Sequence, residues 1–383
     1  MHKHPFLRKT LALILVIFCF SNCKDGNTPN STVKIGMFYN LSGNQAGLDL
    51  PSYRGAILAA DQINQAGGAL QLTLRDGMSQ PDVLQQLAQK QFQDEPETAA
   101  CIGLSDTDML LAAAQVSADN KVPFLTSGAT SPKLPSQVPE YLFLACFGDN
   151  VQAAAAAEFA YNQKNARSVA VVYDSAETYT SLLQGYFITR FEQLGGQVKS
   201  VQAYDRSDLS PVVNQLQGVD LVFLAAMPDE ALPAVKLIRN AGFTMPIVGG
   251  DGFDSEATWS GQTAISEVFY TTHAYIKADN PDPKVQAFRA AFMDAYNYEP
   301  DAFAALGYDT VNLLAQAIAD AKSNDPAAIL SALAAIKNFE GVTGTISYSN
   351  GSRIPLKSVT IIEVKAGTLN LAMQLLPDQI PPP

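Results

Sequence analysis

The sequence has few residues that could support metal-dependent or hydrolytic chemistry. Its 383 residues include 3 histidines, 4 cysteines and 1 tryptophan. His2 and His4 lie in an N-terminal segment that we expect to be removed, which leaves His273 in the mature chain. A site built from several histidines is therefore excluded within one chain, and a hydrolytic triad has at most one candidate base. We expect no enzyme activity, no bound metal and no cofactor.

Several sequence motifs of catalysis and nucleotide binding are also missing. The glycine-rich stretch Gly249 to Gly252 lacks the Gly-x-Gly-x-x-Gly spacing of a dinucleotide site, and no Walker-type lysine follows a glycine loop. The chain has no Gly-x-Ser-x-Gly elbow, which disfavours an exported α/β hydrolase. Turnover of amides or esters that His273→Ala abolished would revive that alternative.

Long hydrophobic runs are confined to the N-terminus. Leu11 to Phe20 is apolar but shorter than the roughly 20 residues that span a membrane, and basic Lys3, Arg8 and Lys9 precede it. Residues 1–22 are therefore predicted to be a signal peptide, and the mature protein to be exported to the periplasm or cell envelope.

The end of this segment resembles a lipoprotein processing site. Cys23 follows Phe20-Ser21-Asn22 and would carry the lipid, and residues 23–32 would form a polar, flexible tether. The alternative is an ordinary signal peptide with a chance cysteine. Cys19 leaves with the signal, so Cys101 and Cys146 remain, both in apolar runs. An oxidising compartment would permit a disulfide, and whether these two are free thiols stays open.

Charge is sparse and mostly negative. Charged residues make up 16% of the chain and the formal net charge is −12, which removal of three bases with the signal makes more negative. Such a surface disfavours nucleic acids and anionic lipid faces. The hydrophobic content of 47% and the length predict a folded globular chain of two domains.

The body of the chain alternates strand-like and helical segments. The strand-like runs are mostly continuous and apolar, as in parallel strands that are covered on both faces. They lie at 33–38, 70–74, 99–103, 123–125, 141–145, 168–173, 197–203, 220–225, 246–248 and 268–272. Helical patterns fall between them, as at 53–65, 109–118, 179–194 and 304–321. Repeated βα units predict an α/β fold with parallel sheets, in two lobes that meet near residues 147–150.

Two loops after such strands have opposite polarity. Leu125 to Pro132 offers hydroxyl groups and free backbone N–H groups, which suit an anion. Gly249 to Ser255 holds the carboxylate of Asp251 among glycines, which suits a cation. Ligands of parallel sheets bind beyond the carboxyl ends of the strands, where both loops fall. A small zwitterion such as an amino acid would match both, although a capped turn at Thr130 and a tight turn at Asp251 are the structural alternatives.

The order and the amino-acid sequences of these segments resemble those of the type I periplasmic binding proteins, and among them the leucine/isoleucine/valine-binding proteins of ABC importers. The resemblance covers roughly Val33 to Val364. The stretches that carry it are Ile35-Gly36 to Gly43, Gly55 to Gly68, Ser127 to Pro132, Val172-Tyr173-Asp174 with Tyr179, and Gly249 to Gly252. It implies two Rossmann-like lobes, joined by a three-stranded hinge, that close on a ligand like a Venus flytrap. Lobe 1 would comprise residues 33–148 and 275–354, and lobe 2 residues 149–274 and 355–383.

The resemblance also implies roles for individual residues. Thr107 would meet the ligand carboxylate with help from the Ser105 backbone, Gly128 and Thr130 would hold the amino and carboxylate ends, and Asp251 would meet the ammonium group. Tyr179 would be an aromatic lid. The pocket for the ligand side chain would draw on Leu48, Met227 and Phe303.

Two departures from the family pattern concern specificity. Leu48 and Met227 stand where relatives commonly have aromatic residues, so the side-chain pocket would be reshaped. Asp106 and Asp108 flank Thr107, which is unfavourable beside a ligand carboxylate unless both acids point to solvent.

The sequence thus predicts a monomeric solute-binding protein for an ABC importer, with a membrane permease as partner. Its ligand would be an aliphatic amino acid or a similar small polar solute, with amides, short carboxylic acids and aromatic amino acids as alternatives. A sensory subunit that signals to a separate receptor is the other functional class. Neighbouring permease and ATPase genes, or kinase and chemoreceptor genes, would distinguish the two.

Overall fold

The computed structural model describes residues 32–348 and 351–383. The predicted signal peptide and Cys23 lie outside these residues. In the described part of the chain, no helix is long and apolar enough to cross a membrane. Cys101 and Cys146 are both buried and both free, so no disulfide joins them.

The first half of the chain forms a sheet of five parallel strands in the order β2-β1-β3-β4-β5. This order is typical of doubly wound folds. The strands are β1 (Val33–Tyr39), β2 (Leu70–Asp76), β3 (Ala100–Gly103), β4 (Phe124–Thr126) and β5 (Leu142–Leu144). The connecting helices are α1 (Ala46–Gln65), α2 (Pro81–Asp94), α3 (Thr107–Asp119) and the short α4 (Leu134–Gln137).

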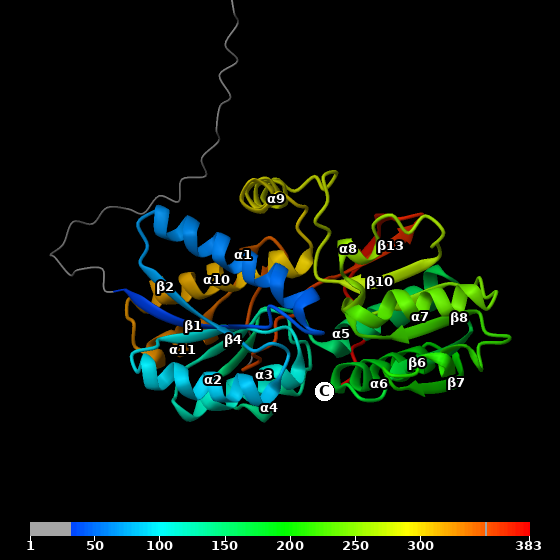
Figure 1. The fold of residues 1–383 in the computed structure, drawn as a ribbon, viewed down its shortest axis with the longest axis horizontal. Helices are drawn as coiled ribbons and strands as arrows, with labels where there is room; N and C mark the ends of the chain where they lie inside the picture. Colours follow the sequence, from blue (N-terminus) through cyan, green and yellow to red (C-terminus); the bar gives the residue numbers. More distant parts are fainter. Residues whose placement is uncertain (1–31, 349–350) are drawn as a thin grey trace, which may run out of the picture. The chain divides into compact units, whose positions relative to one another are not determined.

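Both faces of this sheet are covered. Alternate residues of β1 point to opposite sides, as the period of two in a strand requires. Ile35 and Met37 pack in one core with Val311 of helix α10, whereas Phe38 packs in another with Leu110 of α3. Helices α9 (Pro283–Tyr296), α10 (Ala302–Ala321) and α11 (Pro326–Ala335), with the hairpin β11 (Phe339–Gly341) and β12 (Gly344–Ile346), come from much later in the sequence. Figure 1 shows α10 and α11 beside α1 and the first sheet.

A second sheet of seven strands has the order β14-β13-β10-β9-β8-β6-β7. Five strands are parallel, namely β6 (Ser168–Asp174), β7 (Gln197–Tyr204), β8 (Leu221–Ala225), β9 (Ile247–Gly249) and β10 (Val268–Thr272). Strands β13 (Val359–Lys365) and β14 (Thr368–Leu375) add an antiparallel edge. The helices around this sheet are α5 (Asp149–Glu158), α6 (Thr178–Gln193), α7 (Pro228–Asn240) and α8 (Glu256–Trp259).

The sequence prediction of an α/β fold with mainly parallel sheets is confirmed, but three details differ. Helix α1 begins at Ala46 rather than Tyr53, and it contains Pro51. The antiparallel strands β13 and β14 were not predicted. The packing of the C-terminal residues was also not predicted: Asn150 donates a hydrogen bond to the Pro381 carbonyl, and Ile380 contacts the core around Phe147.

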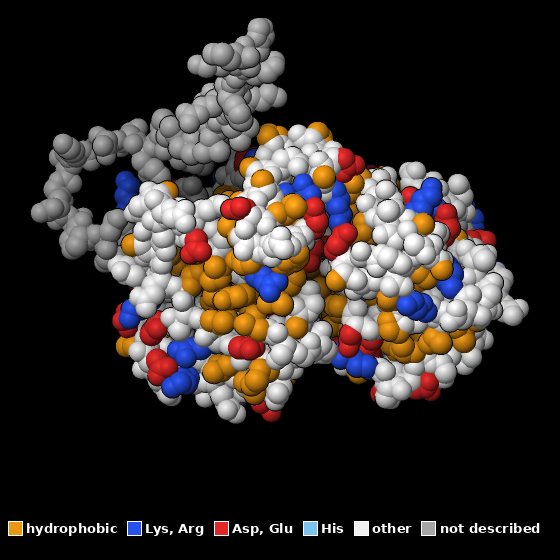
Figure 2. Space-filling view, turned by 45° about the horizontal axis from the view of Figure 1, so that its top comes forward, with side chains coloured by type: hydrophobic (Ala, Val, Ile, Leu, Met, Phe, Trp, Pro, Cys, Tyr) orange, Lys and Arg blue, Asp and Glu red, His pale blue; other side chains and the backbone are white. Residues whose placement is uncertain are grey.

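The described surface carries few large exposed hydrophobic residues. On the face in Figure 2, hydrophobic side chains are interspersed with acidic and basic ones. The exposed large hydrophobic residues are Met78, Val201, Leu237, Met293, Leu356, Leu371 and Leu376. They belong to several different elements of the fold.

Candidate functional site

Loops from both sheets line one small pocket. Ser105 and Asp106 follow β3, Thr130 follows β4, and Asp251 follows β9, so each lies beyond the carboxyl end of a parallel strand. The pocket encloses about 270 Å³ of empty space, counting the part that is open to solvent. Its lining residues are Gln45, Leu48, Ser105, Asp106, Thr130, Tyr179, Met227, Pro228, Asp251, Gly252 and Phe303.

Most of the site residues predicted from the sequence lie in this lining. Leu48, Ser105, Thr130, Tyr179, Met227, Asp251 and Phe303 are among them. Thr107 and Gly128 are not. Thr107 is the buried first residue of α3. Gly128 lies just behind the wall, where an added Cβ would come within 2.9 Å of both Ser105 Oγ and Phe303 Cε1.

Asp251 is held by donors on both of its carboxylate oxygens. Gln152 Nε2 and the Tyr179 hydroxyl donate to Oδ1 at 2.9 and 2.7 Å, and His273 Nε2 lies 3.0 Å from Oδ2. The side-chain oxygen of Gln152 also accepts the backbone N–H of Asp251. Asp251 is 3% exposed, and these contacts are what a buried carboxylate needs to remain tolerable. Oδ2 retains a lone pair for a ligand donor.

A glycine beside Asp251 allows this arrangement. An added Cβ at Gly250 would lie 2.4 Å from the Tyr179 hydroxyl oxygen, so a larger residue would push the tyrosine away from Asp251. The same hydroxyl accepts the backbone N–H of Gly252 at 3.2 Å. The glycine-rich stretch that the sequence suggested for cation binding therefore allows a tyrosine to approach the backbone closely.

Two residues of this network were not predicted from the sequence. His273 is buried and stacks on Phe147 at a ring distance of 4.0 Å, and burial lowers its pKa. It is therefore neutral near pH 7, with the Nε2 proton donated to Asp251 and Nδ1 without a partner among the described residues. Its place after β10, at the ligand-facing edge, was the available signal. Gln152, within α5, gave no such signal.

A second carboxyl group, that of Asp149, shares the Gln152 amide nitrogen with Asp251. Gln152 Nε2 donates to Asp149 Oδ1 at 3.0 Å as well as to Asp251. Burial, and then the charge of Asp251, raises the pKa of Asp149 to about 8. Asp149 is thus largely protonated at neutral pH.

The opposite wall is formed by the start of helix α3, where the sequence indicated a conflict with a ligand carboxylate unless Asp106 and Asp108 both point to solvent. Asp106 does not point to solvent: it is 5% exposed and lines the pocket. It is the N-cap of α3, and its Oδ1 accepts the backbone N–H groups of Asp108 and Met109 at 3.0 Å each. Burial raises its pKa to about 6. An aspartate before an apolar helical run is an N-cap signal that could have located it.

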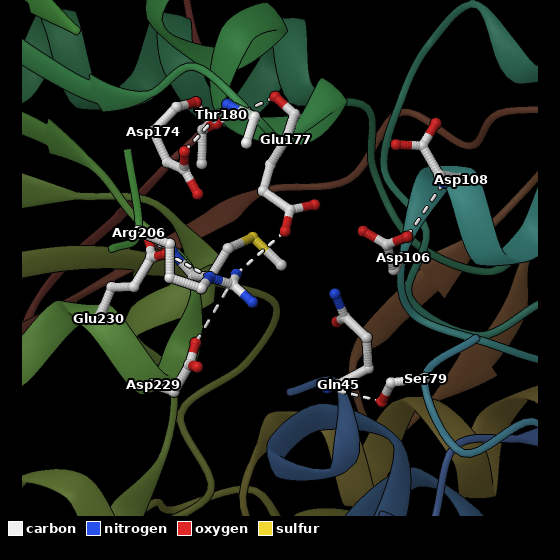
Figure 3. Close-up of polar contacts among 12 residues, drawn as sticks. Gln45, Ser79, Asp106, Asp108, Asp174, Glu177, Thr180, Arg206, Asp229 and Glu230 are labelled. Atoms are coloured by element: carbon white, nitrogen blue, oxygen red, sulfur yellow. Dashed lines mark hydrogen bonds and ion pairs between the residues drawn. The ribbon is translucent and has the colours of Figure 1, made fainter. Parts of the chain in front are cut away.

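Across from Asp106 lies a cluster of charges around Arg206. Its guanidinium donates to Glu177 at 3.0 Å and to Glu230 at 2.7 Å, and Asp229 lies 3.9 Å away. In Figure 3 the Glu177 carboxylate faces Asp106 across an open space. Burial, and then the charge of Asp106, raises the pKa of Glu177 to about 7.

The remaining lining is apolar or uncharged. Leu48, Met227, Pro228 and Phe303 present hydrophobic surface, which suits an aliphatic group. Gln45 is 1% exposed and was not predicted, because nothing in its sequence context separates it from a surface glutamine.

In the described part of the chain, no group of three or more His, Cys, Asp or Glu residues is arranged to hold a metal ion.

Comparison with known proteins decides the family. The sequence profile of the periplasmic binding proteins matches residues 32–368. The chain belongs to that family. The Leu/Ile/Val-binding protein homolog 1 of Brucella abortus is 26% identical over 336 residues, which cover 84% of this chain and 88% of that protein.

Solved structures of similar proteins agree with the observed fold. A leucine-binding protein from Thermotoga maritima superposes with a TM-score of 0.82 and 30% identity, over 91% of this chain and 99% of that one. A branched-chain amino acid transporter substrate-binding protein from Streptococcus pneumoniae, in complex with isoleucine, gives a TM-score of 0.83 and 26% identity over 90% and 100% of the two chains. The fold of this binding protein is therefore the type I fold that its sequence resembled.

Proposed function

We propose that this chain is the non-catalytic solute-binding component of an ABC importer, and that it captures an aliphatic amino acid or a similar small polar solute. The observation that carries the proposal is one pocket, lined from both sheets, that places the Asp251 carboxylate near the apolar side chains of Leu48 and Met227. Relatives named for leucine, isoleucine and valine binding support it.

Each part of such a solute has a matching group in the pocket. Its ammonium group would bind Asp251, and its other polar end would meet the hydroxyl groups of Ser105 and Thr130. Its aliphatic part would contact Leu48, Met227 and Phe303, with the Tyr179 ring closing the pocket. Thr107 and Gly128 do not line the pocket. They would contribute indirectly, by positioning the residues that do.

We further propose two lobes, residues 33–148 with 275–354 and residues 149–274 with 355–383, that close on the solute. Sheet membership supports this division, because β1–β5 belong to one sheet and β6–β10, β13 and β14 to the other. A direct contact between the lobes is the hydrogen bond from Thr178 Oγ1 to Asp108 at 3.1 Å. The solute would drive closure because it binds the closed state more tightly than the open one.

The site of action would be the cell envelope. The family name and the apolar, basic start of the chain support export, and Cys23 would carry the lipid that anchors the protein near a membrane permease. Intact-mass analysis of the protein from membranes would show an acylated N-terminal Cys23, and a Cys23→Ala variant would be released in soluble form. A mature N-terminus at another residue would rule the anchor out.

A thermal-shift screen tests the binding function. Amino acids, their amides and short carboxylic acids would be added singly, and a ligand of the folded state raises the unfolding temperature. At a concentration about 100 times its Kd, a ligand stabilises the protein by about 2.7 kcal/mol. If no compound in the panel changed the unfolding temperature, the proposed class of ligand would be wrong.

A further inference from the structure

The charge of the pocket lining is entirely negative. Asp106 and Asp251 are its charged residues, and the lining contains no Lys, Arg or His. The nearby guanidinium of Arg206 is already bound by Glu177 and Glu230. His273 is neutral because burial lowers its pKa. A zwitterionic amino acid would therefore find partners for its ammonium group but no cation for its carboxylate.

Helix α3 cannot supply that partner. The N-terminus of a helix ordinarily attracts anions because its first N–H groups are free and its dipole is positive there. In this chain Asp106 Oδ1 already accepts two of those N–H groups, from Asp108 and Met109. Figure 3 shows the second oxygen of Asp106 directed away from the helix, toward Glu177. A ligand carboxylate at this wall would meet a carboxylate.

Gln45 gives an independent indication of what binds here. It is 1% exposed and lines the pocket, and neither its Nε2 nor its Oε1 has a hydrogen-bond partner among the described residues. In Figure 3 its amide points toward the space below Asp106. Buried amides are normally hydrogen-bonded, so this side chain offers one donor site and one acceptor site to a ligand.

We propose that the ligand is a small amine with a carboxamide, rather than a free carboxylate, at the end that faces Asp106 and Gln45. The ammonium group binds Asp251. The carboxamide N–H groups donate to Asp106 Oδ2 and Gln45 Oε1, and its carbonyl accepts from Gln45 Nε2. A carboxamide can donate hydrogen bonds to Asp106 and Gln45 and can also accept one from Gln45. A carboxylate can accept hydrogen bonds but cannot donate them. This inference rests on the proposed function of the pocket as a site for small amines.

Leucine and leucinamide form a matched pair of probes, because they differ only in replacement of the carboxylate by the amide. Isothermal titration calorimetry of the purified, ligand-free protein would measure both at neutral pH. We expect leucinamide to bind at least about tenfold more tightly than leucine, which corresponds to about 1.4 kcal/mol. Tighter binding of leucine would overturn the inference and leave the proposed function intact. If neither bound and the solute screen also found no amine, the proposed function itself would fail.

The variant Asp106→Asn tests whether Asp106 distinguishes a ligand carboxamide from a ligand carboxylate. Asparagine is as good an N-cap as aspartate, so the helix is retained while the charge is removed. We expect the preference for leucinamide to fall by about tenfold or more, chiefly through tighter binding of leucine. Asp325→Asn is the matched control, because Asp325 is the N-cap of α11, accepts the Ala327 N–H there, and does not line the pocket. A preference that stayed the same in Asp106→Asn would show that Asp106 does not select the ligand.

Discussion

The two walls of the pocket each present one aspartate, but the two side chains are used in different ways. Both oxygens of Asp251 are bound by long-range partners, from Gln152, Tyr179 and His273. Among the described residues, the hydrogen bonds of Asp106 are local: one oxygen accepts the N–H groups two and three residues along α3. Asp251 is thus a fixed acceptor within a network, whereas Asp106 is a helix cap whose second oxygen faces the ligand space.

This difference assigns separate properties to the two walls. Loss of a partner of Asp251 leaves buried donors unsatisfied, so binding and stability are coupled there. Substitution of Asp106 by another capping residue changes the charge of the pocket with little change in hydrogen bonding. The Asp251 wall is expected to set affinity for an ammonium group, and the Asp106 wall to set discrimination at the other end of the solute.

The largest effect is expected from Asp251→Asn. Loss of a charge-assisted hydrogen bond of ~1.5–3 kcal/mol weakens amine binding roughly 10- to 150-fold. Asparagine is preferable to alanine because its oxygen still accepts from Gln152 and Tyr179. His273 can also change tautomer, since its Nδ1 has no partner among the described residues. Calorimetry with leucinamide measures the effect. Asp294→Asn, at an exposed position, is the control, and equal affinity in both variants would remove Asp251 from the site.

Tyr179→Phe, on the Asp251 wall, should lower the stability of the protein more than Asp106→Asn on the opposite wall. Asp251 Oδ1 loses a donor and the Gly252 N–H loses its acceptor, at a cost of about 1–3 kcal/mol in the free energy of unfolding. Asp106→Asn should not lower the same quantity, because the cap is kept and a buried carboxyl group whose pKa is raised is replaced by a neutral amide. Urea unfolding of the ligand-free proteins compares them. Equal loss in both variants would contradict the distinction between the two walls.

The pH dependence of binding should come from the Asp106 side. The pKa is raised to about 6 for Asp106 and to about 7 for Glu177, mainly by burial. Asp108 and Asp49 add negative charge around Asp106, and Arg206 lowers the pKa of Glu177. Both acids ionise as pH rises from about 5 to about 7, below the pKa of an α-amino group, so affinity for leucinamide should rise a few-fold across that range.

The same shifts act on stability in the opposite sense. The folded chain holds these two protons to higher pH than the unfolded chain, so their contribution to the stability of the ligand-free protein falls as pH rises through that interval. The pH dependence of binding is measured by calorimetry with leucinamide at about pH 5 and about pH 7. In Asp106→Asn, the change of affinity between these two pH values should be smaller. An affinity that fell with rising pH would contradict the assignment.

The smallest effect on ligand affinity is expected from the hydrogen bond between Thr178 and Asp108, which lies outside the pocket lining. Thr178 Oγ1 donates to Asp108 at 3.1 Å, and Asp108 also contributes a backbone N–H to the Asp106 cap. This hydrogen bond is exposed to solvent, so Thr178→Val should weaken ligand affinity by about twofold or less. Ser181→Ala, one turn along α6, is the control. A loss of tenfold would mean that this contact governs closure.

The sequence indicated the arrangement of the site better than its chemistry. Asp251 and Thr130 could be predicted because each follows an apolar strand, and strand ends of a parallel sheet converge at one edge. The sequence showed that Asp106 would conflict with a carboxylate ligand unless it pointed to solvent, but it did not show where the side chain points. Its burial depends on loops and helices from the other half of the chain, which no local pattern reveals.

The sequence by itself determined the alternation of strands and helices, the family and the loops that carry the site, because hydrophobic periodicity and turn residues act over a few neighbouring positions. The tertiary structure decided which polar atoms are already used. Gln152 and His273 reach Asp251 from 99 and 22 residues away, and the amide of Gln45 in the pocket has no partner within the part of the chain that the structure describes. Hydrogen bonds between distant segments are fixed by packing, and the selectivity that we propose rests on their saturation at one wall and their incompleteness at the other.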